Sequence, residues 1–98
     1  MITEHAILEV KPGKEDEFVT AMDHAKTIIA ASPGFVSLRV ERCLERPGRF
    51  LLLVLWARLE DHTEGFRGSA AYEEWRALLH HFYDPFPEVE HFEQVVTA

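Results

Sequence analysis

The sequence predicts a single α+β domain over residues 1–98, with elements in the order β-α-β-β-α-β. Short segments that alternate apolar and polar residues are typical of strands, and they are separated by two longer segments with helical periodicity. The composition is that of an ordinary globular protein, with 47% hydrophobic and 28% charged residues. A chain of 98 residues is long enough to bury one core.

The first strand and the first helix are predicted over residues 2–10 and 14–31. The strand segment alternates, with Ala6 and Leu8 on one side and His5 and Ile7 on the other. The helix begins with acidic residues, which suit the positive end of its dipole. One helical face carries four apolar residues, Phe18, Met22, Ala25 and Ile29. The sequence Ser-Pro-Gly at 32–34 ends the helix.

Two further strands are predicted over residues 35–44 and 50–57, joined by a short turn at 45–49. The turn contains Pro47 and Gly48, so the two strands form a hairpin. The segment 50–57 is apolar on both of its faces. This pattern is typical of a central strand that is covered above and below.

The second helical region is predicted to be broken, because Gly65 and Gly68 interrupt its periodicity. Ser69 is a good N-cap for a helix over residues 70–82. A loop containing two prolines follows, and residues 89–96 form the last strand.

This order of elements favours a ferredoxin-like fold, a four-stranded antiparallel sheet with both helices on one face. One face of the sheet would then be bare, although its strands place apolar residues on both faces. Two such sheets packed face to face would cover that surface. We therefore expect a homodimer through the sheet face.

The composition excludes several classes of function. The net charge is -7 and there is no cluster of basic residues, so nucleic acid is a poor partner. The longest apolar run, 50–57, is too short for a membrane span, and no signal peptide is recognisable, so we expect a cytoplasmic protein. The single cysteine, Cys43, has no flanking base and receives no chemical role. The six histidines include no pair spaced four residues apart, so we predict no metal.

Three segments of the chain are recognisable together: KPGKEDEF, SPGF and LLLVLWARLEDHTEGFRGSAAYEEWRALL. The most characteristic positions are Gly34-Phe35, Trp56, and the spacing of Phe66, Ser69 and Tyr72. With these features nearly the whole chain resembles the antibiotic biosynthesis monooxygenase family of dimeric α+β barrels.

The resemblance implies a chemistry without metal or flavin. Members that oxidise aromatic polyketides let the substrate's own phenolate or carbanion donate an electron to O₂. The protein then needs aromatic walls, a base and a cation in a dry site. The resemblance therefore implies no cofactor, and a small aromatic substrate together with O₂.

Two pocket residues of a quinone-forming member fall on identical residues in this chain, Trp56 and Arg76. At two other positions this chain differs, with Leu52 in place of an asparagine and His62 in place of a tyrosine. The residues used by a haem-degrading branch of the family are absent, so we exclude haem degradation.

The candidate catalytic residues are His62 or His91 as the base and Arg76 as the cation that holds the oxyanion. The candidate substrate-binding residues are Trp56, Phe66, Arg67 and Tyr72. Each has a plainer interpretation. The aromatic residues are also at core positions, and the arginines and histidines also suit surface or structural roles.

Two functional hypotheses follow from these residues. The first is a cofactor-independent monooxygenase acting on a small aromatic, quinol-like or polyketide substrate, with an isomerase or decarboxylase on the same pocket as a close variant. The second is a non-catalytic dimeric barrel that binds a small metabolite, which Leu52 in place of a polar residue favours. A cavity with inward-facing polar groups distinguishes the first from the second.

Overall fold

The computed structural model describes all 98 residues and has the predicted order of elements. The elements are β1 (Ile2–Glu9), α1 (Glu15–Ala30), β2 (Phe35–Arg42), β3 (Arg49–Trp56), η1 (Asp61–Phe66), α2 (Ala70–Leu79), η2 (His80–Phe82) and β4 (Val89–Phe92). The segment η1 is a short π-helix, and η2 is a single 3₁₀ turn.

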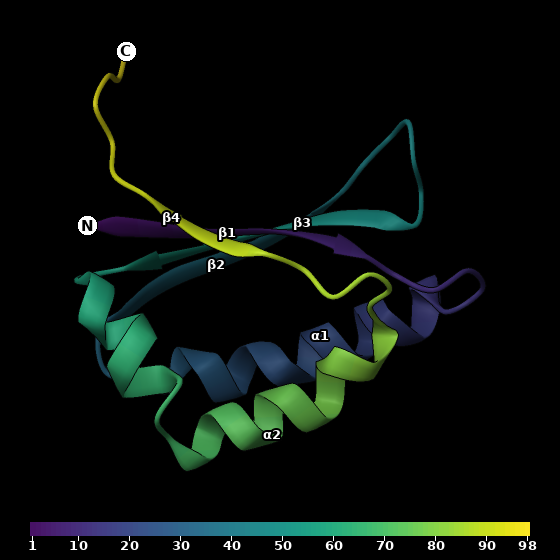
Figure 1. Ribbon diagram of the computed structural model, residues 1–98, viewed down its shortest axis with the longest axis horizontal. Coiled ribbons are helices and arrows are strands. Elements are labelled where there is room, and N and C mark those ends of the chain that lie inside the picture. Colours follow the sequence, from purple (N-terminus) through teal and green to yellow (C-terminus); the bar gives the residue numbers. More distant parts are fainter.

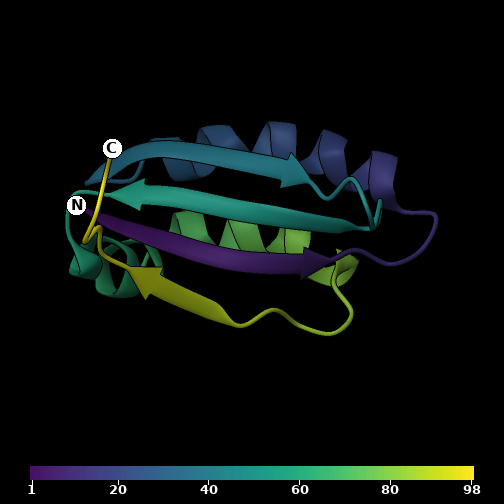
Figure 2. The ribbon, with the colours of Figure 1, turned by 90° about the horizontal axis from the view of Figure 1, so that it is seen from above.

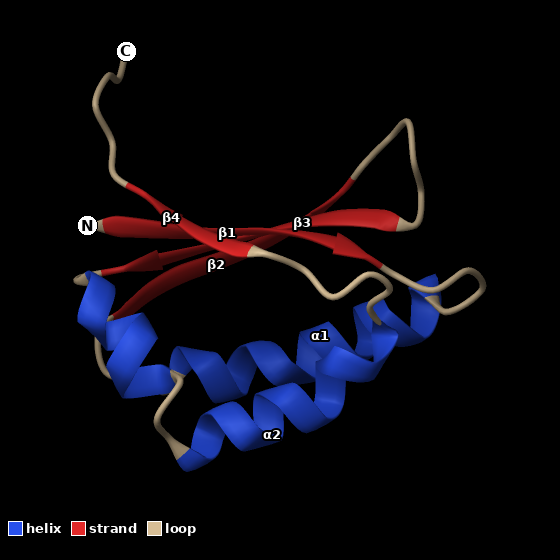
Figure 3. Cartoon of the chain, viewed as in Figure 1, coloured by secondary structure: helices blue, strands red, loops and turns tan.

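The four strands form one antiparallel sheet in the order β2-β3-β1-β4. Both helices lie on the same face of this sheet, and no helix lies on the other (Figures 1 and 3). From above, α1 runs behind the edge strand β2, and α2 runs behind β3 and β1 (Figure 2). The predicted ferredoxin-like α+β fold is confirmed.

The core lies between the sheet and the helices, because β1 and β3 alternate strictly. Every second residue of β3, from Phe50 to Trp56, is buried, and the residues between them are only partly covered. Helix α1 buries the four predicted residues against the sheet: Phe18, Met22, Ala25 and Ile29. Helix α2 buries Trp75 and Leu79.

The opposite face of the sheet is apolar and uncovered. The odd-numbered leucines of β3, Leu51, Leu53 and Leu55, are half-buried there by their neighbours in the sheet alone. Ile7 on β1 is 38% exposed and Phe92 on β4 is 49% exposed. This face is the surface that the sequence predicts to meet a second copy.

Two predicted strands are too long. Strand β2 ends at Arg42, and Leu44 is 90% exposed in the following turn. Strand β4 ends at Phe92, which pairs with Thr3 near the start of β1. Beyond that pair β1 has almost no residues left to bond with, so the chain leaves the sheet (Figure 1). Neither helix is long and apolar enough to cross a bilayer.

Candidate active site

A cavity of about 370 Å³ lies between the sheet and α2. Most of its wall is apolar or aromatic. The lining residues are Glu4, Ala6, Leu8, Leu52, His62, Phe66, Arg67, Tyr72, Trp75, His80, Tyr83, Phe86, Pro87 and Val89. The lining therefore comes from β1, β3, η1, α2, β4 and the segments between them, and its polar side chains come from β1, η1, α2 and the segments that flank α2.

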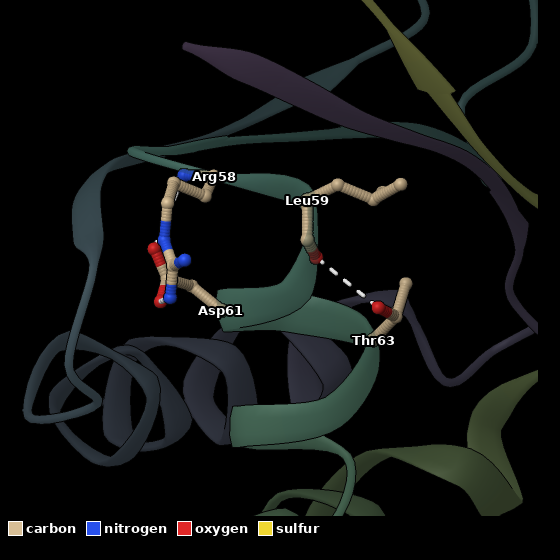
Figure 4. Close-up of polar contacts among 4 residues, drawn as sticks. All are labelled: Arg58, Leu59, Asp61 and Thr63. Atoms are coloured by element: carbon tan, nitrogen blue, oxygen red, sulfur yellow. Dashed lines mark hydrogen bonds and ion pairs between the residues drawn. The ribbon is translucent and has the colours of Figure 1, made fainter.

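The π-helix η1 places His62 in the cavity wall. The start of η1 is fixed by local hydrogen bonds (Figure 4). The carboxylate of Asp61 accepts the backbone N–H of Arg58 at 3.1 Å and its guanidinium at 3.4 Å. Thr63 donates its hydroxyl to the carbonyl of Leu59 at 3.3 Å. A π-helix is rare and often marks a functional site, because it re-aims side chains inside a helical segment.

Two glycines permit this local path. Gly34 has φ +84°, and a Cβ atom there would lie 2.1 Å from the carboxylate of Asp61. A Cβ at Gly68 would lie 2.6 Å from the carbonyl oxygen of Glu64. The break in the helix at Gly68 is thus as predicted. Ser69 then caps α2 as expected, since its side chain accepts the N–H of Tyr72 at 3.3 Å.

Glu4 is a buried carboxyl group on the helix-facing side of β1, only 5% exposed. Its Oε1 accepts the indole N–H of Trp56 at 3.0 Å. The same oxygen lies 3.3 Å from Nε2 of His62. No hydrogen bond within the chain uses the second oxygen, Oε2, although Glu4 lines the cavity. Oε2 is therefore the acceptor available to a bound molecule.

His62 is held by one face of its ring and by both of its ring nitrogens. Its ring stacks on Trp56, with centroids 5.4 Å apart and planes 17° from parallel. Its Nδ1 is 2.7 Å from Nε2 of His91, which extends from the edge strand β4. His62 is only 3% exposed. The imidazole therefore bridges Glu4 on one strand and His91 on another.

The protonation of this group follows from burial. Burial raises the pKa of Glu4, and the hydrogen bond from Trp56 and the charge of Arg67 oppose that rise. Burial, followed by the charges of Arg67 and His91, lowers the pKa of His62 to about 3. His62 is therefore neutral at pH 7, and its contact with Glu4 is not an ion pair. Burial and Arg67 also lower the pKa of His91.

Arg67 is the cation of the cavity wall. It directly follows η1, lines the cavity, and takes part in none of the ion pairs in the chain. Its charge is felt by Glu4, His62 and His91. The guanidinium is therefore free to meet a negative group on a ligand.

Arg76, expected to hold the oxyanion, lies outside the cavity. Its side chain is 58% exposed and its guanidinium is 3.7 Å from the carboxylate of Glu73. Successive residues of a helix are about 100° apart, so Trp75 facing the core turns Arg76 toward solvent. The expectation that Arg76 faces the pocket is corrected in favour of Arg67.

The other expected residues divide into two groups. Phe66 and Tyr72 line the cavity and meet edge-to-face, with ring centroids 5.5 Å apart. Trp56 is fully buried and lies behind His62 rather than on the wall. Its place is to support His62 and Glu4. His91 contacts His62 but does not itself line the cavity.

Glu4 is the residue that sequence reasoning missed. It lies on the same side of β1 as Ala6 and Leu8, so the alternation put a carboxylate on an apolar face. That mismatch was the available signal. No three His, Cys, Asp or Glu side chains are grouped in a way that could hold a metal ion.

Comparison with known proteins agrees with this architecture. The family model described as antibiotic biosynthesis monooxygenase matches residues 1–78. The uncharacterized protein YczJ of Bacillus subtilis is 52% identical over 95 residues, which cover 97% of this chain and 100% of that protein.

Solved structures give the same result. A structure from Bordetella bronchiseptica that carries the same family name is 32% identical, has a TM-score of 0.92, and is matched over 97% of both chains. SnoaB, a cofactor-independent oxygenase from Streptomyces nogalater, is 18% identical with a TM-score of 0.82 over 98% of this chain and 94% of its own. At that identity SnoaB shows the fold alone. The expected family is confirmed, and this chain belongs to the antibiotic biosynthesis monooxygenase family.

Proposed function

We propose that this protein is a cofactor-independent monooxygenase that converts a small phenol or related aromatic into a quinone with O₂. One observation carries the proposal: a buried carboxyl, a buried neutral histidine and an unpaired arginine share one largely apolar cavity. Apolar walls with a few convergent polar groups are typical of small-molecule sites.

The cavity suits a planar substrate of one to a few rings. Its volume of about 370 Å³ is near the lower end of the usual range for ligand pockets. Phe66, Tyr72 and Trp75 supply aromatic surfaces. Burial and the nearby Glu4 raise the pKa of Tyr83, so its hydroxyl stays protonated and serves as a donor.

Glu4 acts as the base in this proposal, with His62 behind it. A carboxylate with a raised pKa accepts a phenolic proton more readily than an ordinary one. His62 alone is a poor final acceptor, because burial makes its charged form costly. Arg67 stabilises the phenolate that results.

The oxygen step uses O₂ as the only oxidant. The phenolate gives one electron to O₂, and the substrate radical and superoxide then join through a new C–O bond at a ring carbon bearing hydrogen. The peroxide anion takes a proton back, its O–O bond breaks, and that carbon loses its hydrogen. The products are one quinone and one water, so atoms and electrons balance.

The uncovered sheet face supports a homodimer as part of the same proposal. Leu51, Leu53 and Leu55 form an apolar stripe that a second copy would cover, with Ile7 and Phe92 beside it. Such a stripe is unusual on a protein that stays single. Sedimentation at micromolar concentration is expected to give the mass of two chains.

Oxygen uptake with a panel of anthrone, naphthol and quinol compounds tests the function. At least one compound is expected to consume O₂ in the presence of the protein with no added metal or flavin. With that compound, Arg67→Ala is expected to lower kcat/KM about 10- to 100-fold, or about 1.4 to 2.7 kcal/mol. Arg76→Ala is the matched control, because Arg76 faces solvent, and it is expected to change the rate less than twofold.

Two results would contradict the proposal. The first is that no compound of the panel consumes O₂ above the protein-free rate. The second is an equal loss in both arginine variants, which would show that the cavity charge has no special role. Tight binding of a panel compound without turnover would favour the metabolite-binding alternative.

A further inference from the structure

The histidine of β4 has no task in the chemistry proposed above. His91 lies directly opposite Glu4 in the pairing of β4 with β1, so both side chains are on the helix-facing side of the sheet. It reaches His62 with a contact of 2.7 Å between ring nitrogens. Three proton-carrying groups thus stand in a row, Glu4, His62 and His91.

The two ends of this row differ in their surroundings. Glu4 is buried and lines the cavity, whereas His91 is half-buried on an edge strand and does not line it. His62 closes the space between them. The three side chains therefore connect the cavity to the exposed edge of the sheet at β4 without an open channel.

On the basis of the proposed function, we propose that Glu4, His62 and His91 form a proton relay, in which His91 stores the substrate's proton during the oxygen step and then returns it. Glu4 and His62 touch the cavity. His91 acts through them and is a positioning and storage residue.

The transfers balance in both directions. In the outward direction the substrate O–H bond breaks, its electron pair stays on the substrate, and the proton bonds to Glu4. After the carboxyl group turns, it passes a proton to Nε2 of His62 while the proton on Nδ1 of His62 passes to Nε2 of His91. His91 is then an imidazolium, and Glu4 is again a carboxylate. The same transfers run backward to protonate the peroxide.

Storage at His91 has a physical advantage. A proton left on Glu4 would sit in the cavity, ready to return to the phenolate before O₂ reacts. A proton on His91 lies beyond His62 and nearer to water, where burial disfavours an imidazolium less than it does at His62. The gap of 3.3 Å between Glu4 and His62 is within the range that tightens when a catalytic site is occupied.

The decisive experiment compares His91→Gln and His91→Ala with His24→Gln, since His24 is an exposed histidine on α1. His91→Gln keeps a polar side chain but carries no proton. We expect kcat for the active panel compound to fall about a hundredfold, the lower end for a positioned proton carrier. We expect KM to stay within about twofold, and His24→Gln to match wild type.

Two readouts separate a relay from a structural contact. Added imidazole is expected to raise kcat of His91→Ala in a saturable manner. The solvent deuterium isotope effect on kcat is to be compared between wild type and His91→Gln. We expect it to disappear or change size in the variant. A purely structural role would instead lower Tm in both variants, with no response to imidazole and an unchanged isotope effect, and would overturn the relay.

A measurement without substrate keeps failure of the relay distinct from failure of the oxygenase. In ¹⁵N spectra of the full chain, Glu4→Gln is expected to shift the ring nitrogens of both His62 and His91, while His24 stays in place. Unchanged His91 resonances would overturn the relay whatever the activity. Coupled shifts with no oxygen uptake would leave the relay standing and contradict only the oxygenase.

Discussion

Two hollows of nearly equal volume lie on the helix side of the sheet, and only one of them is lined by buried ionisable side chains. The groove between α1 and β2 measures about 380 Å³ and the cavity beside α2 about 370 Å³. The charged groups of the groove are exposed: Asp23 pairs with Lys26 at 2.6 Å, and Arg42 lies over the ring of Phe50 at 5.2 Å. The cavity instead contains the buried Glu4 and His62.

The difference shows that volume does not identify a site in this fold. A buried carboxyl or imidazole costs stability unless it is partnered, and here each one has a partner. Exposed ion pairs such as Asp23–Lys26 change the free energy of unfolding only a little in either direction. The α1 half of the core is therefore built for packing, and the α2 half gives up some apolar packing for polar groups.

The largest expected effect on the rate comes from replacing one acidic residue in each hollow by its amide. Glu4→Gln keeps an oxygen that accepts the N–H of Trp56 but removes the base, so the oxygenation rate is expected to fall about 100- to 10,000-fold. Asp23→Asn in the groove is expected to leave the rate unchanged. Oxygen uptake with the active panel compound measures both variants.

Stability is the control for that exchange. Because burial already disfavours the charged form of Glu4, the neutral glutamine is expected to change the free energy of unfolding by no more than about 1 kcal/mol. Urea unfolding checks this value. Equal activity in Glu4→Gln and Asp23→Asn would erase the distinction between the two hollows.

The next effect is the response of stability to acid. His62, beside Glu4, Arg67 and His91, has its pKa lowered from 6.5 to about 3. As the pH falls, this ring is therefore protonated in the unfolded chain at a higher pH than in the folded chain. The stability that the neutral ring contributes is complete above pH 6.5 and is lost as the pH falls toward 3, by about 1.4 kcal/mol per pH unit.

Glu4 acts in the opposite sense over part of this range. Its raised pKa stabilises the fold below 4.5, and that stability is lost as the pH rises through the folded value. Below pH 4.5 Glu4 therefore no longer opposes the slope of His62. Urea unfolding of His62→Gln is expected to show a shallower slope from pH 4.5 to 3 than wild type, while His24→Gln runs parallel to wild type. Parallel slopes in all three proteins would mean that His62 is not buried neutral.

The sequence predicts the packing half of this molecule better than the chemical half. Helix α1 shows its four buried residues as a plain periodic stripe, and the cap at Ser69 was visible as a residue type at a helix start. The site needed contacts between elements far apart in the chain. Glu4 and His62 are 58 residues apart, and only the folded sheet and the π-helix bring them to 3.3 Å.

Arg67 and Arg76 show the same limit from another side. Arg76 was a candidate because the family resemblance places a pocket arginine at that position. The π-helix η1 and the glycine break after it change the helical phase, so the side chains of α2 do not continue the rotation of those in η1. Periodicity cannot show that change of phase, so it could not place Arg67 in the cavity wall. Within α2 the buried Trp75 turns Arg76 toward solvent.

The smallest expected effect tests what sets that phase. Asp61→Ala removes the acceptor for the N–H of Arg58 at the start of η1, and a single cap of this kind is worth about 1 kcal/mol. The hydroxyl of Thr63 bonds a carbonyl four residues earlier, a contact that adds little to a helix, so Thr63→Val is expected to cost less than about 0.5 kcal/mol. Urea unfolding resolves the two variants. If they cost the same, the position of His62 depends on its stacking with Trp56 and not on the Asp61 bond, because only the packing would then remain to hold η1 in place.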